Sequence, residues 1–254
     1  MTAGTEDLSL ALELADLADS ITTASFRRRG LVVETKPDMT PVTEADRGVE
    51  RAMRDVLAER RPGDRIVGEE FGDTDGHADR RWIIDPIDGT KNFVRGVPVW
   101  ATLVALEGQV GVVSAPALGR RWWAATGLGA FADGEPIRVS KVEQLADAQV
   151  SYGGMEGWEA RGGPERLMRL TERCWRDRGF GDFWSHMLVA EGACEIGLDP
   201  IVSIWDLAAL QVIVEEAGGT FTDFKGEPRA DGGSAISSNG LVHEAALRIL
   251  RGEP

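Results

Sequence analysis

The sequence predicts an α+β protein in which helices are layered against sheets in two parts. Helical periodicity occupies the first 60 residues, and short apolar runs separated by turn residues occupy residues 65–132. These runs predict a mainly antiparallel sheet. Longer helical and strand patterns alternate after residue 140 and predict a second, smaller α/β unit. We therefore expect two subdomains, residues 1–140 and 141–254.

Two helices are expected in the first subdomain before its sheet begins. The first has apolar residues at steps of four, three and four, which are Leu10, Leu14, Leu17 and Ile21, and it should end within residues 27–30. A loop containing Pro37 and Pro41 should follow. Thr43 is the expected N-cap of the second helix, which should close at residues 61–63.

Short apolar runs predict the strands of the first sheet at residues 66–67, 82–84, 99–106, 110–114 and 122–125, and around Phe131. Turn residues at 107–108 and at 133–135 predict two hairpins. In the second subdomain we expect helices at residues 164–178, 183–192 and 203–217 and from about 241, with strands at 220–222 and 235–237.

Composition excludes several classes of function. The 42 acidic and 28 basic residues give a formal charge of −14, which disfavours binding to nucleic acid. No apolar stretch reaches the roughly 20 residues of a membrane span, and a signal peptide is not indicated. Cys174 and Cys194 lack zinc-site spacing, which favours reduced thiols and a cytoplasmic location. An acidic enzyme that acts on phosphates usually depends on bound metal to invert the local charge.

The densest chemical signal is an apolar strand that runs into Asp85 and Asp88. Pro86 restricts the backbone between the two acids, and Gly89 permits an unusual φ angle before the next segment. Two carboxylates on a rigid turn suit Mg²⁺, which prefers hard oxygen ligands. The alternative is a turn in which both acids cap the following helix.

Two further acidic positions end or begin elements in a similar way. Glu69 and Glu70 follow an apolar strand, and Asp206 lies at the start of a helix behind Ser203. A pair of glutamates is also typical of a solvated edge, and an acid in the first helical turn can simply complement the helix dipole. Spacing alone leaves both alternatives open.

Three motifs in this order resemble the inositol monophosphatase superfamily. They are residues 68–70, residues 85–90 followed by Asn92 and Phe93, and residues 205–206 followed by residues 216–219. The resemblance implies a layered αβαβα sandwich and a Mg²⁺-dependent phosphatase that acts on a small phosphate ester. It also implies two or three Mg²⁺ ions per site, inhibition by Li⁺, and a homodimer.

The resemblance also assigns roles to residues of this chain, with residues 1–140 as the metal-binding subdomain. Its metal ligands would be Glu69, Asp85, the Ile87 carbonyl, Asp88 and Asp206, with Asp85 bridging two ions. Thr90 and Asp46 would orient or deprotonate the attacking, metal-activated water, and the amides of Gly89 and Thr90 would bind phosphate. Asp46 could equally form a capping box with Thr43, and Glu70 could lie behind the ligands rather than among them.

Residues 95–103, 113–123 and 178–183 resemble the histidinol-phosphatase branch of the superfamily, of the actinobacterial type. This resemblance implies hydrolysis of histidinol phosphate to histidinol and phosphate in histidine biosynthesis. Residues 141–254 would then select the substrate, with Gly181, Asp182 and Asp199 as the specificity residues. Extra carboxylates and an aromatic ring suit a cation that bears an imidazole, although both acids could be ordinary turn or helix-cap residues.

Other functions remain open at this point. An inositol monophosphatase or a broad sugar-phosphate phosphatase would share the same metal ligands, and a regulatory binding protein is a less favoured alternative. His77, His186 and His243 show no metal-ligand spacing, so we assign none of them a catalytic role.

Overall fold

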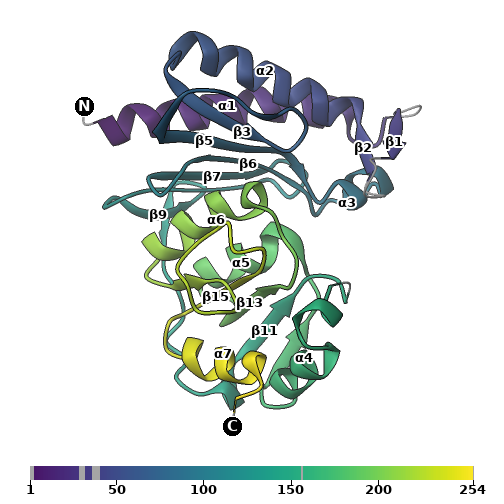
Figure 1. Cartoon of the computed structure of the whole chain (residues 1–254), viewed down its shortest axis with the longest axis vertical. Helices are drawn as coiled ribbons and strands as arrows, with labels where there is room; N and C mark the ends of the chain where they lie inside the picture. The colour runs from purple at the N-terminus through teal and green to yellow at the C-terminus, as the bar shows by residue number, and fades with distance from the viewer. Residues whose placement is uncertain (1–2, 29–31, 36–40, 156, 254) are drawn as a thin grey trace.

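The computed structural model describes residues 3–28, 32–35, 41–155 and 157–253, which form five layers (Figure 1). Two helices cover one face of a large sheet, two lie between this sheet and a smaller one, and two cover the outer face of the smaller sheet. In that order the helices are α1 (Ala3–Ser25), α2 (Glu44–Arg60), α5 (Asp182–Ala190), α6 (Ile204–Glu216), α4 (Pro164–Thr171) and α7 (His243–Arg251). The predicted αβαβα sandwich is confirmed.

The large sheet has eight strands in the order β10-β9-β8-β7-β6-β5-β3-β4. Their bounds are β3 (Asp64–Gly68), β4 (Gly72–Asp73), β5 (His77–Asp88), β6 (Ala101–Leu106), β7 (Val110–Ala115), β8 (Arg120–Ala125), β9 (Gly129–Ala132) and β10 (Glu135–Ile137). Strands β3 and β5 are parallel, and the other neighbours in this sheet are antiparallel. Both predicted hairpins form, between β6 and β7 and between β9 and β10.

The smaller sheet has the order β12-β11-β13-β15-β14. Its strands are β11 (Gln149–Tyr152), β12 (Arg176–Arg178), β13 (Ile196–Asp199), β14 (Thr220–Thr222) and β15 (Ala235–Ser238). Strand β11 is parallel to β12 and β13, whereas β15 is antiparallel to β13 and β14. The chain passes from the large sheet to the smaller one between residues 137 and 149, the region where we placed the boundary. The division into two subdomains stays a prediction.

Two expectations from the sequence are wrong. The helix expected over residues 164–178 ends at Thr171, because Arg176–Arg178 pair with Gln149–Ser151 as an edge strand. The loop expected around Pro41 contains a short hairpin of β1 (Val33–Thr35) and β2 (Pro41–Thr43), in which Pro41 pairs with Thr35. Pro37 lies outside the described residues.

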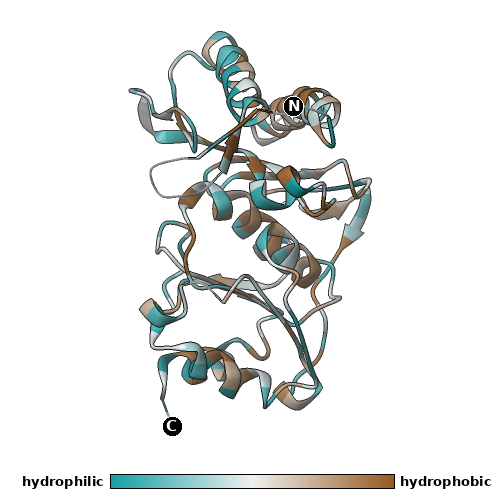
Figure 2. Ribbon diagram, turned by 90° about the vertical axis from the view of Figure 1, so that its right-hand side faces the viewer, coloured by the Kyte–Doolittle hydropathy of each residue, from teal (hydrophilic) through white to brown (hydrophobic). Residues whose placement is uncertain are grey.

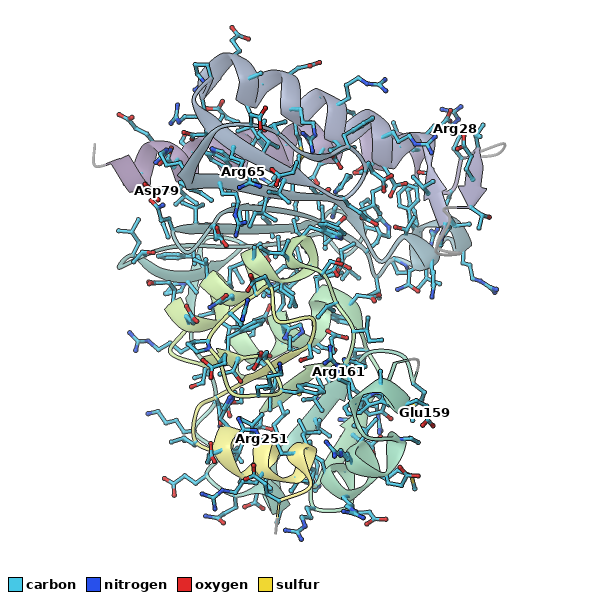
Figure 3. All side chains as sticks on the ribbon, viewed as in Figure 1. Arg28, Arg65, Asp79, Glu159, Arg161 and Arg251 are labelled. Atoms are coloured by element: carbon cyan, nitrogen blue, oxygen red, sulfur yellow. The ribbon has the colours of Figure 1, made fainter. Side chains whose placement is uncertain are left out.

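Helices cover both faces of the large sheet, so a hydrophobic core forms on each face. Every residue of β6 and β7 is buried, and side chains alternate between the two faces. Ile84 and Val104 pack toward α1 and α2, whereas Ile83 and Leu103 pack toward α5 and α6. Figure 2 shows the hydrophobic residues along the strands and on the helices between the layers. Charged side chains such as Arg28, Asp79 and Glu159 project outward (Figure 3).

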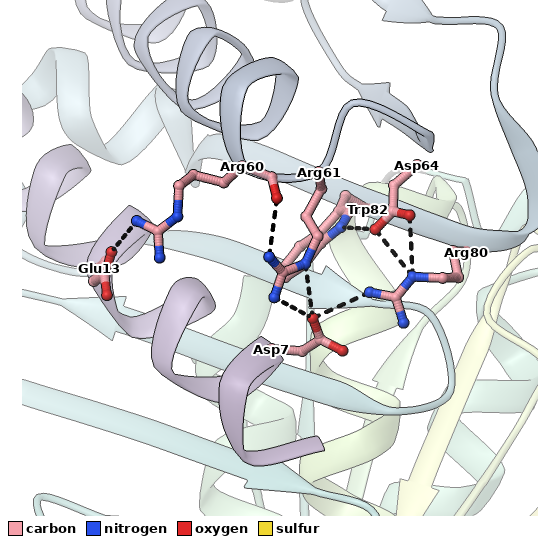
Figure 4. A network of polar contacts seen from close by, with 7 residues as sticks. All are labelled: Asp7, Glu13, Arg60, Arg61, Asp64, Arg80 and Trp82. Atoms are coloured by element: carbon pink, nitrogen blue, oxygen red, sulfur yellow. Dashed lines mark hydrogen bonds and ion pairs between the residues drawn. The ribbon is translucent and has the colours of Figure 1, made fainter. Parts of the chain in front are cut away.

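A buried acid fixes α1 to the rest of the first two layers (Figure 4). Asp7 is 3% exposed, and its Oδ1 accepts hydrogen bonds from Arg61 Nη2 at 2.9 Å and Arg80 Nη2 at 3.1 Å. Arg80 also contacts Asp64, whose Oδ2 accepts a 2.9 Å bond from Trp82 Nε1. The network therefore connects the N-terminal part of α1 with the end of α2 and with strands β3 and β5.

Among the described residues, the helices are too short or too polar to cross a bilayer.

We predict that Asp7→Asn lowers the free energy of unfolding by about 2 kcal/mol, because two guanidinium groups lose their shared carboxylate. Glu13→Gln is the matched control, since Glu13 pairs with Arg60 at an exposed site and should change stability by less than about 1 kcal/mol. Urea unfolding of both variants measures the difference. Equal losses in the two variants would contradict the structural role of Asp7.

Candidate active site

The end of β5 places Asp85 and Asp88 at a β-bulge. Asp85 pairs with Leu103 and Asp88 pairs with Ala101, so β5 contains one extra residue between the two pairs. Thr102 Oγ1 donates to the Pro86 carbonyl at 2.8 Å, and the Ile87 amide donates to Asp85 Oδ1 at 2.9 Å. These bonds hold the bulge and fix the direction of the Asp85 carboxylate.

The helix that follows the bulge is not capped by either aspartate. Helix α3 (Thr90–Arg95) has Gly89 as its N-cap residue, with φ of 81°, and no side chain caps it. A Cβ atom on Gly89 would lie 3.0 Å from the Val99 carbonyl oxygen and 3.3 Å from Asp182 Oδ2. Glycine is therefore required both by the backbone conformation and by the close approach of these groups. The helix-cap alternative for Asp85 and Asp88 is wrong.

Helix α6 brings Asp206 to the same place from the middle layer. Ser203 is the N-cap residue, and its amide donates to Asp206 Oδ2 at 2.6 Å. Asp85, Asp88 and Asp206 each present a carboxylate oxygen, and these oxygens lie within 4.8 Å of one another. We call these three residues the acidic cluster. Asp206 therefore both caps its helix and belongs to the cluster.

Burial raises the pKa of each carboxyl group in the cluster. The pKa of Asp206 rises to about 7, mainly through burial and with a contribution from the charge of Glu69. Burial and the charges of Glu69 and Asp88 raise the pKa of Asp85 well above its usual range. Burial and the charge of Asp182 do the same for Asp88. A divalent cation fits this donor set, since it would neutralise closely spaced oxygens that otherwise repel one another.

Glu69 follows β3 and lines the same cavity as Asp88 and Asp206. Its charge contributes to the raised pKa values of Asp85, Asp206 and Asp46. Glu69 and Glu70 are both half-buried. Glu69 therefore belongs to the wall of the site, and the half-burial of both glutamates argues against a fully solvated edge.

Asp46 and Thr90 lie side by side next to the bulge. Asp46 Oδ2 accepts the Thr43 amide at 2.8 Å, which completes the capping box of α2. Asp46 Oδ1 lies 3.5 Å from Thr90 Oγ1, which also donates to the Ile87 carbonyl at 2.9 Å. Burial raises the pKa of Asp46 to about 6. The capping expectation is confirmed, and it leaves Oδ1 directed toward Thr90.

A cavity of about 690 Å³ is lined at one end by Glu69, Asp88, Thr90 and Asp206. It extends to a second acidic wall. Gly181, Asp182 and Asp199 all line it, together with Phe180. Asp182 has φ of 49° and accepts a 3.1 Å bond from Asn92 Nδ2. Burial and the charge of Asp199 raise the pKa of Asp182 to about 6. Among the described residues, the carboxylate of Asp182 contacts the side chain of Asn92, and that of Asp199 contacts the side chain of His186, so neither contact is to a helix-end amide.

His186 lies behind this wall, although we assigned it no catalytic role from the sequence. Its Nε2 lies 2.8 Å from Asp199 Oδ2, and its Nδ1 lies 2.8 Å from Ser237 Oγ. His186 is fully buried between α5 and the smaller sheet. A polar residue on a helix buried between two sheets needs partners, and this was the available signal in the sequence. The pair leaves Asp199 Oδ1 facing Gly153, where a Cβ would lie 2.4 Å from it.

Comparisons with known proteins agree with this architecture. The model of the inositol monophosphatase family matches residues 5–253. The chain is 53% identical to the histidinol-phosphatase of Mycobacterium tuberculosis, covering 96% of this chain and 98% of the relative. It is 50% identical to the histidinol-phosphatase of Streptomyces coelicolor, covering 96% and 97%. The solved IMPase of Thermotoga maritima superposes with a TM-score of 0.87 at 33% identity, covering 97% of each chain.

The raised pKa values predict a pH-dependent stability for the metal-free protein. Asp206 titrates near 3.8 when unfolded and at about 7 when folded. The folded state therefore binds the proton of Asp206 more tightly than the unfolded state does. This proton binding stabilises the folded state fully below pH 3.8, and the stabilisation is lost as the pH rises through about 7. We predict that Asp206→Asn, which can still accept the Ser203 amide, melts at a higher temperature than the wild type at about pH 8 with a chelator present.

Asp55→Asn provides the control for this measurement, because Asp55 is an exposed acid on α2. The advantage of Asp206→Asn should shrink at about pH 5, where the acidic cluster is largely protonated. Melting curves recorded by circular dichroism across this range test the expectation. A constant difference between Asp206→Asn and the wild type at all pH values would contradict it.

Proposed function

This chain belongs to the inositol monophosphatase family, and we propose that it is a phosphoric monoester hydrolase that converts histidinol phosphate to histidinol and phosphate. The observation that carries the proposal is one cavity with the acidic cluster at one end and the wall of Asp182 and Asp199 at the other. The first surface would hold the metal for hydrolysis, and the second would bind a cationic ester. The two relatives of 50% and 53% identity support this choice of substrate.

Asp85, Asp88 and Asp206 would hold Mg²⁺, with Glu69 and the Ile87 carbonyl as further ligands and Asp85 shared between two ions. The oxygen-only donor set suits a hard cation. When bound, Mg²⁺ would supply positive charge to the phosphate oxygens and lower the pKa of the attacking water. Two or three ions per site and inhibition by Li⁺ are part of the same proposal, as the family resemblance implies.

The residues beside the acidic cluster would position the reactants. Asp46 Oδ1 and Thr90 Oγ1 lie 3.5 Å apart, so a proton from the attacking water could pass to Thr90 and on to Asp46. A pKa of about 6 suits a group that accepts a proton near neutral pH. The amides of Gly89 and Thr90, at the start of α3, would donate to the phosphate.

The opposite wall would select the alcohol. Histidinol phosphate carries an ammonium group and an imidazole, and the wall offers two carboxylates and the ring of Phe180. Gly181 lines the cavity before Asp182 and has φ of 75°, a conformation that suits glycine. Asp182 and Asp199 would therefore act as the specificity residues of an enzyme of histidine biosynthesis.

The second candidate is an inositol monophosphatase or a broader sugar-phosphate phosphatase. The 33% identical IMPase of Thermotoga maritima favours it, because the same fold could serve a polyol phosphate. A regulatory binding protein is disfavoured, since such a role does not need the buried acidic cluster. A homodimer and a cytoplasmic location are also part of our proposal.

Release of phosphate from a panel of esters, with and without Mg²⁺, tests the proposed function directly. The wild type should act on histidinol phosphate only with the metal, and its kcat/KM should exceed that for inositol phosphate. We predict that Asp88→Asn lowers turnover by about 1000-fold or more, because it removes a charged ligand. Asparagine can still accept the Phe183 amide, which now donates to Asp88 Oδ2 at 2.7 Å, so the fold should persist.

Unchanged circular dichroism and melting temperature provide the control for Asp88→Asn. Full activity of this variant would refute the role of Asp88. A preference of the wild type for inositol phosphate would favour the second candidate. No release from any ester would rule out both enzyme hypotheses.

We predict that Asp182→Asn lowers kcat/KM for histidinol phosphate by about 10-fold to 100-fold, because a charged hydrogen-bond partner is lost. Asparagine tolerates the φ of 49° and keeps the bond from Asn92, so this change removes little except the charge. Hydrolysis of p-nitrophenyl phosphate, which has no cationic group, should change far less. Equal losses on both esters would reduce Asp182 to a structural role.

A further inference from the structure

The loop that carries Glu69 is bound to a buried carboxylate from another layer. Residues 69–71 connect β3 to β4, where Gly68 pairs with Gly72. Glu50 of α2 is fully buried, and it accepts the amide of Glu70 at 2.7 Å and the amide of Phe71 at 3.0 Å. Its two oxygens therefore satisfy two successive amides of this loop.

A second side chain of α2 holds the far end of the same loop. Arg54 Nε donates to Glu50 Oε1 at 2.8 Å, and Arg54 Nη2 donates to the Gly72 carbonyl. Asp46, Glu50 and Arg54 are spaced by four residues, so they lie along one face of α2. One helix face thus determines where the loop lies relative to Asp46.

Because Gly68 has no side chain, the Glu50 carboxylate can pack against its backbone. A Cβ on Gly68 would lie 2.1 Å from Glu50 Oε1 and 2.9 Å from Arg54 Nη2. The glycine before the two glutamates is therefore required for this contact, whereas no positive φ requires it.

We propose that Glu50 is a positioning residue that fixes residues 69–71 and thereby holds Glu69 in place for the divalent cation. This inference rests on the proposed function, because Glu69 must be a metal ligand. A full carboxylate is needed, since the group accepts two amides and one guanidinium N–H at once. A glutamine offers only one accepting oxygen and would turn an NH₂ group toward one of these donors.

Glu50→Gln is the first variant, and Glu59→Gln is its matched control, an exposed glutamate on the same helix. The first measurement is the melting temperature of the substrate-free protein as Mg²⁺ is added, which reports binding without catalysis. The second is phosphate release at increasing Mg²⁺. We expect Glu50→Gln to raise the half-saturating Mg²⁺ concentration by about 10-fold to 100-fold in both measurements, with a smaller change in kcat at saturating metal. Glu59→Gln should match the wild type.

Gly68→Ala tests the same contact without removing the carboxylate. The added methyl group must displace Glu50, so Mg²⁺ affinity should fall as it does in Glu50→Gln. In a Glu50→Ala background the methyl group meets only the flexible end of the Arg54 side chain, which can shift, so Gly68→Ala should then add little. This lack of additivity is expected only if the glycine acts through Glu50.

The proposal is overturned if Glu50→Gln lowers the melting temperature of the metal-free protein but leaves the half-saturating Mg²⁺ concentration unchanged. Additive effects of Gly68→Ala and Glu50→Ala would also overturn it. If Glu50→Gln does not fold, Gly68→Ala decides alone, and unchanged Mg²⁺ affinity in that variant rejects the role. If the wild type releases no phosphate but Mg²⁺ still stabilises it and stabilises Glu50→Gln less, the proposed function fails and the positioning role stands.

Discussion

The burial of mutually repelling carboxylates is the constraint on which the rest of this structure depends. Asp85, Asp88 and Asp206 come from a strand and a helix in different layers, yet their oxygens lie within 4.8 Å of one another. Burial and neighbouring charges raise all three pKa values, so the arrangement costs free energy when no cation is bound. The layers must therefore hold these groups in place against their own repulsion, which a loosely packed loop could not do.

The fold restrains each acid by the same device, a hydrogen bond from a backbone amide to one carboxylate oxygen. The amide of Thr43 donates to Asp46, and that of Ile87 donates to Asp85. The amide of Phe183 donates to Asp88, and that of Ser203 donates to Asp206. All four distances are 2.6–2.9 Å. Such a bond stabilises the charged form and leaves the second oxygen for the site. A capping role and a role in the cluster are therefore compatible, and the sequence could not separate them because one residue can perform both.

The predictable part of the site is the part with local causes. The caps at Thr43 and Ser203 and the turn at Gly89 depend on neighbouring residues, so their patterns are visible in the sequence. The bulge at Asp85–Asp88 was not predicted, because it depends on pairing with β6 and on the bond from Thr102. The contacts of His186 with Asp199 and of Glu50 with residues 70–71 join segments 13 or more residues apart. Strands β11, β12 and β13 are short and acquire their conformation from pairing, which is why helix α4 was predicted to extend too far.

The electrostatics of the whole cavity bear on the choice of substrate under the proposed function. At the phosphate end, bound metal would neutralise the acidic cluster. At the other end, burial and the charge of Asp199 raise the pKa of Asp182 to about 6, so this wall is also costly to keep ionised. A polyol would leave that cost in place, whereas an ammonium or imidazolium group would offset it on binding. Under the proposed function, the wall would therefore favour a cationic alcohol for the same physical reason that the cluster would favour a divalent cation.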